Sequence, residues 1–540
     1  MARRANNPDV IYRRRWLSLS VLCVSLLVIV LDNTILNVAL PRLSQDLHAS
    51  TSALQWIVDI YVLVFAGLLL TAGSLGDRFG RYKALVFGMV IFGLGSLASA
   101  LSGSASALIA TRAFMGIGGA FIMPATLSII TNVFTDPIER GRAIGIWAGV
   151  SALGAGIGPL AGGFLLTHFY WGSVFFVNVP IIIAGLIAGW FLIPDSRDPT
   201  APKLDPVGAL LSIVGLATVL WAIIEAPSHG WTSTPIVLAF LVGVAVIAGF
   251  VLWELHTPSP MLNMAFFKNP RFTAASLAIT LTFLAMFGSL FIMTQYLQAV
   301  LGYTPLQAGA VLLPQAVLVM IVAPLSSKRV IRYGNKLVVA VGMAFVCLGL
   351  LGYGLFQVDS PVWLVILMTM TIGMGMGNVL APATDSIMGS LPREKAGVGS
   401  AMNDTTRQTG GAIGVAVLGS VLASRFTAGL SSAASLAHVP HDVAAQARQG
   451  ITDAVVAAQS PAAAHYRTAL IAVAKQSFMN GFHLAAFIAA GIIFFAALGV
   501  LRWLPARPAA EVVTVIPDAP AEPAAAPTAV APALAPVFDD

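Results

Sequence analysis

Three charged residues, Asp32, Asp59 and Arg112, lie inside long apolar segments of the sequence. A charged side chain at the centre of a membrane costs roughly 2.5–3.5 kcal/mol or more, so such residues persist where they have a partner or a task. Each stands about six residues from the outer end of its predicted helix, which places all three at a similar depth. Two acids that share one arginine cannot both be ionised and satisfied, so one carboxyl should hold a proton near neutral pH. The pattern indicates proton transfer in the outer half of a membrane, with a static salt bridge as the alternative.

A second charged group occurs in the stretch MNDTTRQTGG, residues 402–411, which opens another apolar segment. Arg407 follows Asp404 by three residues, so the two side chains can pair on one face of a helix. Asp385 lies near the cytoplasmic end of the predicted helix before it. Two acids and one arginine thus recur in the inner half of the membrane. These residues either exchange protons with an aqueous cavity or form a fixed ion pair near the headgroups.

The composition explains why these charges stand out. The 540 residues are 58% hydrophobic and 10% charged, whereas soluble domains carry about 25% charged residues. The mean hydropathy is +0.87, so we predict a polytopic membrane protein. The formal charge of +6 does not indicate nucleic-acid binding, because the basic residues fall in short loops. The two cysteines, Cys23 and Cys347, lie in apolar segments and do not suggest a disulfide framework.

The charged residues must be positioned by membrane-spanning helices, each of which needs about 20 apolar residues. The sequence predicts an all-α membrane protein with fourteen such helices, at 17–38, 53–73, 84–101, 106–128, 143–165, 173–193, 207–226, 235–253, 272–294, 305–325, 337–356, 362–388, 398–424 and 482–503. An even number of helices places both termini on one side. Most of the 29 Lys and Arg residues fall in loops on that side, while the opposite side holds Arg42, Arg425, Arg448, Arg467 and Lys475. This bias predicts cytoplasmic termini.

An internal repeat predicts how the helices are grouped. Pro124-Ala125-Thr126 recurs as Pro382-Ala383-Thr384, in each case before a short charged loop and a Gly-rich helix. We therefore expect two six-helix halves with two inserted helices, an arrangement typical of transporters. The predicted divisions are a basic tail (1–16), an N-terminal half (17–193), inserted helices with flanking loops (194–271), a C-terminal half (272–503) with an external loop (425–481), and a disordered Ala/Pro-rich tail (504–540).

Several motifs resemble those of the major facilitator superfamily, and specifically its fourteen-helix drug:proton antiporters of the EmrB/QacA type. The motifs are GSLGDRFGRYK (73–83), ALGAGIGPLAGG (152–163), LDNTILNVALP (31–41), WIVDIYVLVFAGLLL (56–70) and RAFMGIGGA (112–120). The resemblance covers about residues 16–503 and implies the major facilitator fold, with fourteen helices arranged as 6+2+6. One departure is Gly172, which stands where the family often has an arginine.

The resemblance also implies roles for two motifs. The first is a cytoplasmic gating loop, in which glycines permit a tight turn and charges hold the cytoplasmic side shut: Gly76, Asp77, Arg78, Gly80 and Arg81. An ordinary positive-inside loop is the alternative. The second is the antiporter motif of the fifth helix, whose glycines let helix backbones approach closely: Gly154, Gly158, Pro159, Gly162 and Gly163.

Polar and aromatic residues at membrane depth are candidates for lining a substrate cavity, although single polar residues also join helices to one another. They are Asn33, Asn37, Tyr61, Gln295, Tyr296, Asn378 and Asn403. We expect a proton-coupled multidrug efflux antiporter that exports lipophilic compounds, with cationic ones as candidates, across the plasma (inner) membrane. Its partners would be these substrates, protons and membrane lipids, with no nucleic acid, and it would act as a monomer.

Two alternatives remain at this point: an exporter of an endogenous lipid or metabolite, and an integral-membrane enzyme. The sequence has no nucleophile elbow, no metal-ligand His/Glu pair on a helix and no phosphate-binding loop. We therefore expect no catalytic residues, no metal, no cofactor and no ATP site, with the proton gradient as the driving force.

Overall fold

The structure is a computed structural model that describes residues 8–47, 51–197, 205–260, 262–433, 439–448 and 450–505. The described residues are helical, with no strand among them. The tail predicted at 504–540 falls outside these ranges apart from its first two residues. Within these described ranges fourteen helices are long and apolar enough to span a membrane, which confirms the number predicted from the sequence.

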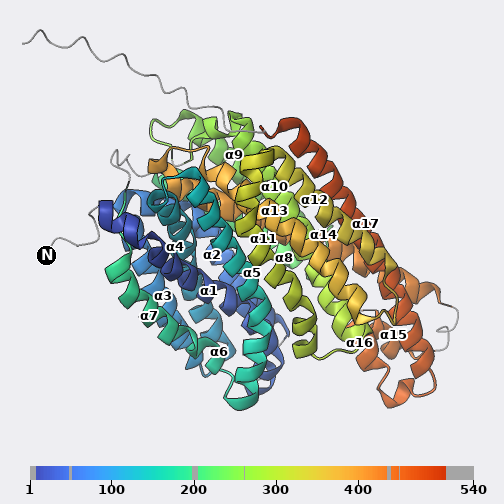
Figure 1. Ribbon diagram of the computed structural model, residues 1–540. Helices are drawn as coiled ribbons and strands as arrows, with labels where there is room; N and C mark the ends of the chain where they lie inside the picture. Colours follow the sequence, from blue (N-terminus) through green and yellow to red (C-terminus); the bar gives the residue numbers. More distant parts are fainter. Residues whose placement is uncertain are drawn as a thin grey trace, which may run out of the picture. The chain divides into compact units, whose positions relative to one another are not determined.

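The helices follow one another with short connections (Figure 1). The N-terminal half contains α1 (Pro8–Asp46), α2 (Thr51–Phe79), α3 (Arg81–Ala100), α4 (Ala105–Val133), α5 (Pro137–His168), α6 (Ser173–Phe176) and α7 (Asn178–Leu192), the last two forming one span. The inserted pair is α8 (Pro206–His229) and α9 (Thr234–His256). The C-terminal half contains α10 (Pro270–Gln295), α11 (Pro305–Tyr333), α12 (Asn335–Gly352), α13 (Val362–Met388), α14 (Ala396–Ser432) and α17 (Arg467–Trp503).

The two halves pack in the same way. In the N-terminal half α4 packs on α2 and α3, and α1 packs on α5; in the C-terminal half α13 packs on α11 and α12, and α10 packs on α14. In the internal repeat, α4 corresponds to α13 and α5 to α14, so these helix pairs occupy equivalent places in the two halves. The halves meet mainly along α5 and α11, with further contacts of α14 with α2 and α4.

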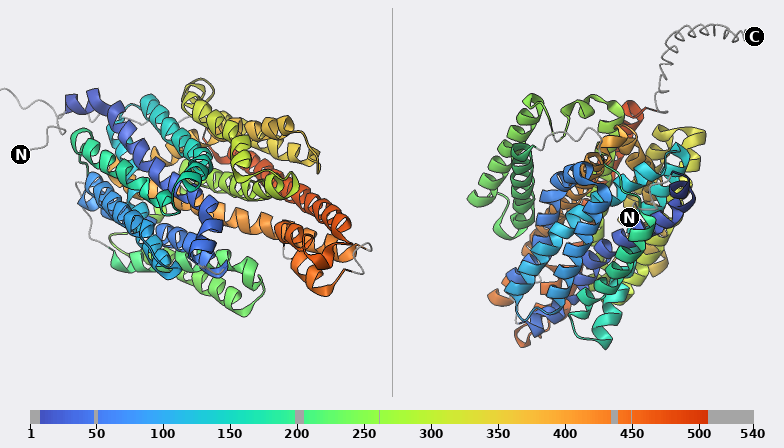
Figure 2. Two further views of the ribbon diagram at one scale, coloured as in Figure 1. Left: turned by 90° about the horizontal axis from the view of Figure 1, so that it is seen from below. Right: turned by 90° about the vertical axis from the view of Figure 1, so that its left-hand side faces the viewer.

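The inserted pair lies on the flank of the bundle, as the green helices in Figure 2 show. Its helix α8 packs against both α2 and α14. Gly67 of α2 faces Ile213 and Ala217 of α8, and Trp231 donates a 2.6 Å hydrogen bond to Ser420 of α14. The inserted pair therefore contacts both halves, chiefly through α8.

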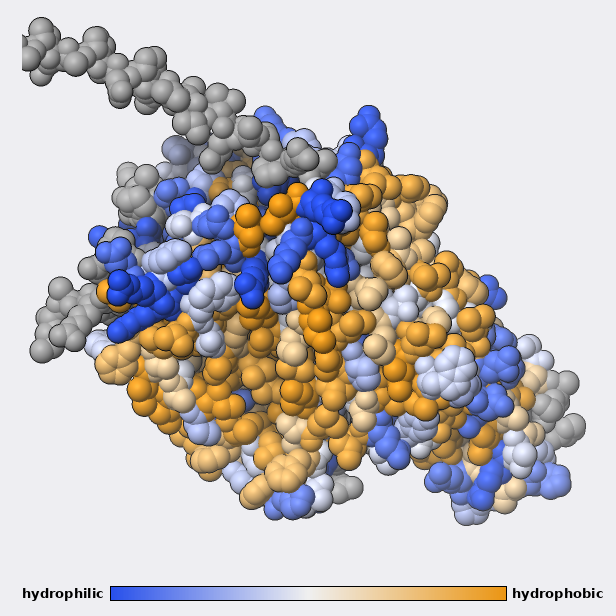
Figure 3. All heavy atoms as spheres, in the orientation of Figure 1, coloured by the Kyte–Doolittle hydropathy of each residue, from blue (hydrophilic) through white to orange (hydrophobic). Residues whose placement is uncertain are grey.

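The outer surface has the polarity expected of a membrane protein. Figure 3 shows apolar side chains over the flank of the helices and hydrophilic side chains gathered toward the ends. Large exposed side chains on this flank include Phe87, Leu94, Ile187, Trp190 and Phe191. In water this apolar area would be unfavourable, whereas lipid tails cover it at no such cost.

The region predicted as a long external loop, 425–481, is largely helical. α14 continues to Ser432 and α17 already begins at Arg467, and between them lie the short helices α15 (His441–Ala447) and α16 (Ile451–Ala457). The two flanking helices therefore extend into the predicted loop from both of its ends. The apolar span fixes only about 20 residues, and a helix can continue beyond it with its backbone hydrogen bonds intact.

Candidate functional site

The outer charged group is a buried ion pair between Asp32 of α1 and Arg112 of α4. Arg112 Nη1 donates to Asp32 Oδ2, and Arg112 Nε donates to the carbonyl of Ile57 at 3.1 Å. The guanidinium lies 4.3 Å from the ring centroid of Tyr61. Because Asp32 is 2% exposed and Arg112 0% exposed, the loss of either partner would leave an uncompensated buried charge.

A second donor to Asp32 was not anticipated from the sequence. Asn178, the first residue of α7, donates from Nδ2 to Asp32 Oδ1 at 3.1 Å and to Ser96 at 3.0 Å. Ser96 in turn donates to the carbonyl of Phe175 at 2.8 Å. The signal was present, because Asn178 is a lone amide in the apolar stretch FFVNVP, and polar groups at membrane depth are usually functional.

The expected cluster of three residues is a pair, because Asp59 does not join Asp32 and Arg112. Asp59 lies instead near a second acid, Glu225 of α8, and Glu225 pairs with His229 at 3.2 Å. The depth argument used a first helix ending at residue 38. Since α1 continues to Asp46, Asp32 lies farther from the helix end than the argument assumed.

The loop 76–83, which the sequence predicts to be cytoplasmic, forms hydrogen bonds across the two halves that are here called the lock. Asp77 Oδ1 accepts hydrogen bonds from Arg81 Nε (2.8 Å) and the Gly397 amide (2.9 Å), and Oδ2 accepts one from the Val398 amide (3.1 Å). Arg81 also donates to the carbonyls of Arg393 and Glu394, at 2.9 and 2.8 Å. The carboxylate thus sits at the N-terminus of α14, where exposed amides and the helix dipole favour negative charge.

The residues of this lock are not equivalent to one another. Gly80 has a φ of +113°, which other residues rarely adopt, so the sharp turn between α2 and α3 depends on it. Gly76, predicted to share that role, lies within α2. Arg78 lies over the ring of Phe79. A Cβ on Gly73 would lie 2.6 Å from the Gly397 carbonyl, so a missing side chain lets α2 and α14 meet closely.

Asp385 forms a second cross-half contact and is not grouped with Asp404 and Arg407 as predicted. Its Oδ1 accepts from Arg140 Nε of α5 at 2.8 Å, and both side chains are mostly buried. Arg393 also donates to the carbonyl of Thr135 at 3.0 Å. These bonds and the Asp77 contacts join the two halves at the end that the sequence predicts to be cytoplasmic.

The inner charged pair differs from the prediction in its geometry. Asp404 and Arg407 are buried on α14, but the hydrogen bonds that they form go to other residues. Arg407 Nη2 donates to Thr384 at 2.9 Å, and its guanidinium lies 4.9 Å from the ring centroid of Trp147 on α5. Asp404 Oδ1 accepts from Asn403 at 3.3 Å. Asp404 Oδ2 and Arg407 Nε have no hydrogen-bond partner.

The glycine motif of α5 places this helix against α1. A Cβ on Gly154 would lie 2.8 Å from Leu27, and Cβ atoms on Gly158 and Gly162 would meet Thr34 and Ile35. Pro159 and Gly163 of the same motif face α11 instead. The motif therefore permits close approach to the helix that carries Asp32 and to the opposite half, as expected of small residues at helix interfaces.

The candidate cavity residues lie in different environments. Tyr61 contacts Arg112, and Tyr296 lies in an aromatic cluster with Tyr353, Phe356 and Phe482. Asn403 accepts from Thr384 at 3.2 Å. Asn33 donates to the carbonyl of Ile29, Asn378 accepts from Arg329 at 2.6 Å, and Gln295 is half-buried at the end of α10. The side chain of Asn37 lies outside the described part of the chain.

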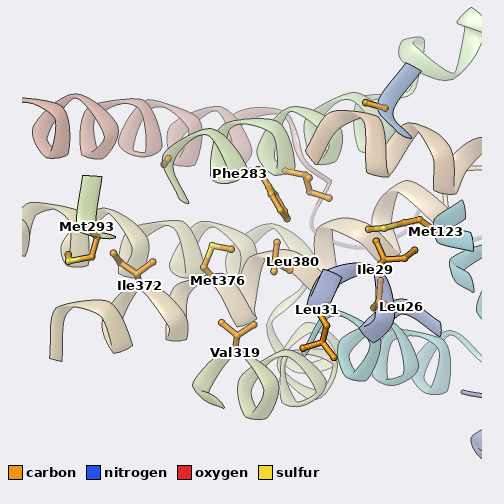
Figure 4. Packing of buried hydrophobic residues seen from close by; sticks show 14 of the residues in the cluster. Leu26, Ile29, Leu31, Met123, Phe283, Met293, Val319, Ile372, Met376 and Leu380 are labelled. Carbon is orange, nitrogen blue, oxygen red and sulfur yellow. The ribbon is translucent and has the colours of Figure 1, made fainter. Parts of the chain in front are cut away.

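Both halves contribute to one apolar core. Figure 4 shows Leu26, Ile29 and Leu31 of α1 and Met123 of α4 in one cluster with Phe283, Val319, Met376 and Leu380 of the C-terminal half. Methionines are flexible and polarisable, so such a core can repack around varied apolar molecules. In the described part of the chain, no group of three or more His, Cys, Asp or Glu side chains could hold a metal ion.

Comparison with known proteins decides the family. A model described as Major Facilitator Superfamily matches residues 22–415. The chain belongs to the major facilitator superfamily. The similar packing of the two halves agrees with this family. The resemblance predicted from the sequence motifs is confirmed.

Relatives in this superfamily match nearly the whole chain. The multidrug efflux pump LfrA of Mycolicibacterium smegmatis is 38% identical over 484 residues, covering 90% of this chain and 95% of that protein. The tetracenomycin C resistance and export protein of Streptomyces glaucescens is 34% identical over 500 residues, covering 92% and 93%. The methyl viologen resistance protein SmvA of Salmonella typhimurium is 35% identical over 425 residues, covering 78% and 86%.

Solved structures of other major facilitator proteins show the same fold. The human organic anion transporter MFSD10 aligns with a TM-score of 0.57 at 14% identity, covering 91% of this chain and 99% of that chain. The proton:xylose symporter XylE aligns with a TM-score of 0.57 at 15% identity, covering 91% and 96%. At these identities the likeness concerns the fold alone.

Proposed function

We propose that this major facilitator protein is a proton-coupled antiporter that exports lipophilic drugs, cationic ones among them, and that it is a transporter rather than an enzyme. The relatives that match most of its length are named for multidrug efflux, for export of tetracenomycin C and for resistance to methyl viologen. Methyl viologen is an organic cation, which supports cationic substrates for this chain.

The observation that carries the proton coupling is the buried contact of Asp32 with Arg112 and Asn178. Burial disfavours the ionised form of Asp32, whereas the positive charge of Arg112 favours it. Because the two effects oppose each other, the carboxyl can gain or lose a proton at little net cost in free energy. Protonation of Asp32 weakens its bond to Arg112 and frees α1 to move relative to α4. In exchange, a proton from outside enters as the drug leaves, and it is released on the cytoplasmic side.

Alternating access would use the cytoplasmic lock. The contacts of Asp77, Arg81 and the Arg140–Asp385 pair join the two halves at one end of the bundle, which we propose is the cytoplasmic end. Substrate from the cytoplasm would reach the apolar core only when these bonds open. We propose no cofactor and no ATP site, with the proton gradient as the sole energy source, and function as a monomer in contact with lipids and without nucleic acid.

Proteoliposomes that contain the purified protein and a fluorescent lipophilic cation test this function. We expect the dye to accumulate inside vesicles when the lumen is acidic and the outside is alkaline, and a protonophore to abolish this accumulation. Vesicles without protein control for dye trapping. Accumulation that is unchanged by the protonophore would contradict proton coupling, and a dye that stays outside under every gradient would contradict export of this class.

We propose a location in the cell membrane with both termini in the cytoplasm, so that the segment with α15 and α16 lies outside. A Ser432→Cys substitution, made in a background without Cys23 and Cys347, should react with a membrane-impermeant thiol reagent on intact cells, because Ser432 is exposed at the end of α14. A Lys83→Cys substitution, at an exposed position in the first turn of α3, is the matched control and should react after permeabilisation. The reverse pattern would invert the proposed orientation.

A further inference from the structure

The inner charged residues belong to a chain of contacts that crosses from one half to the other. Asp404 accepts from Asn403, Asn403 accepts from Thr384, and Thr384 accepts from Arg407. The guanidinium of Arg407 then lies over Trp147 of α5, in the opposite half. Trp147 donates from Nε1 to Thr126 at 3.1 Å.

The repeat gives this chain an approximate symmetry. Thr126 and Thr384 are equivalent positions of the two Pro-Ala-Thr copies. The hydroxyl of Thr126 accepts a hydrogen bond from Trp147, and the hydroxyl of Thr384 accepts one from Arg407. Trp147 and Arg407 then meet between the halves. Thr126, Trp147 and Thr384 are 0% exposed and Arg407 is 6% exposed. Two threonines thus fix an indole and a guanidinium face to face at the boundary.

The charges in this group are not paired as buried charges usually are. Asp404 and Arg407 stand one turn apart on α14, yet Asp404 Oδ2 and Arg407 Nε both lack a hydrogen-bond partner. In the low dielectric of the protein interior, an ionised carboxylate would strongly attract a guanidinium one helical turn away. The turn of Arg407 toward Thr384 and Trp147 is therefore the arrangement expected while Asp404 holds a proton.

We propose that Trp147 is a positioning residue for proton coupling, and that Arg407 exchanges Trp147 for Asp404 when Asp404 loses its proton. While Asp404 is neutral, Arg407 stacks on Trp147 and holds α5 of one half against α14 of the other. When this proton leaves toward the cytoplasm, the carboxylate draws Arg407 along its own helix, the contact between the halves is lost, and the cytoplasmic side opens to admit the next substrate molecule. This inference rests on the proposed function, which it extends to a mechanism for the inner half.

Other charged groups near this part of the fold have partners of their own. Asp77 of α2 bonds to Arg81, and Asp385 of α13 bonds to Arg140, both closer to the cytoplasmic end than Asp404. Arg407 is the charged residue that stands one helical turn from Asp404 on α14. A comparison of the native residue with Asp404→Asn therefore separates its titration from that of the lock.

A single-cysteine reporter tests the exchange without substrate or gradient. Ser327 of α11 faces Gly141 of α5 at the cytoplasmic end of the boundary. We would measure the labelling rate of Ser327→Cys by a water-soluble maleimide in nanodiscs, in a background without Cys23 and Cys347. Normalisation against a denatured sample at each pH removes the intrinsic pH dependence of the thiol.

With Asp404 present, the normalised rate should rise about tenfold or more as pH rises and Asp404 ionises, the size expected for the loss of a desolvated cation–π contact. Asp404→Asn should label slowly at every pH. Trp147→Leu should label fast at every pH, and Trp147→Phe, which keeps a ring, should restore part of the pH dependence. Trp190→Leu, an exposed tryptophan on α7, is the matched control and should behave as the native protein.

The double variant Asp404→Asn/Trp147→Leu should behave like Trp147→Leu. In the proposed sequence of events, the contact with Trp147 is lost as a consequence of proton loss from Asp404, so its removal should make the state of residue 404 irrelevant. Unchanged pH dependence in Trp147→Leu would overturn the proposal, as would strictly additive effects of Trp147→Leu and Arg407→Gln on the labelling rate. Loss of dye export in the native protein would contradict the proposed function but leave this labelling result intact, so the two failures can be distinguished.

Discussion

Asp32→Asn should abolish gradient-driven export while the protein still binds its substrate. Asparagine is neutral like the protonated acid, keeps one acceptor oxygen where Asp32 offers one to Arg112 and one to Asn178, and cannot release a proton. Export against a gradient should therefore fall to the level of vesicles without protein. Substrate binding to purified protein should be retained, and neutral compounds should bind with equal or higher affinity.

Two variants on the same helix define the control for this result. Asp32→Glu keeps a titratable carboxyl and should retain part of the activity. Asp46→Asn removes an exposed acid whose partner is Arg42 at 3.4 Å, and it should export normally because exposed ion pairs contribute about 0–1 kcal/mol. Normal export by Asp32→Asn under a proton gradient would show that the Asp32–Arg112 pair only holds helices together.

Asp77→Asn should leave the protein inserted but slow its transport by about tenfold or more, because each hydrogen bond to a charged group contributes roughly 1.5–3 kcal/mol. The amide cannot accept from Arg81, Gly397 and Val398 with both of its side-chain atoms. It also leaves buried Arg81 without its counter-charge. Efflux at equal membrane abundance measures the effect.

The same change should expose the cytoplasmic side of the boundary between the halves. Labelling of Ser327→Cys should be faster with Asp77→Asn than without it, since one of the bonds that close this side is gone. Lys83→Gln, an exposed change in the same loop, serves as the control and should alter neither efflux nor labelling. Native efflux together with native labelling in Asp77→Asn would argue for an ordinary positive-inside loop.

The fourteen spans and the repeat were predictable because they depend on local composition. A membrane requires each helix to present about 20 apolar residues and to satisfy its own backbone, so hydropathy alone located the helices. The lock was predictable in its residues, since Gly80, Asp77 and Arg81 lie within one short motif. The Asp32–Arg112 contact was anticipated because each charge, alone in an apolar helix, needed a partner at a similar depth.

The partners of the other charges were decided by the tertiary structure. Asp59 lies near Glu225 rather than Arg112 because its face of α2 packs against α8. Asp385 pairs with Arg140 because α13 packs against α5. Sequence spacing predicted a pair of Asp404 with Arg407, but Trp147, from the opposite half, offers the guanidinium a competing face. A sequence determines that a buried charge must have a partner, whereas the rotation and crossing of the packed helices determine which side chain reaches it, because that depends on contacts between segments hundreds of residues apart.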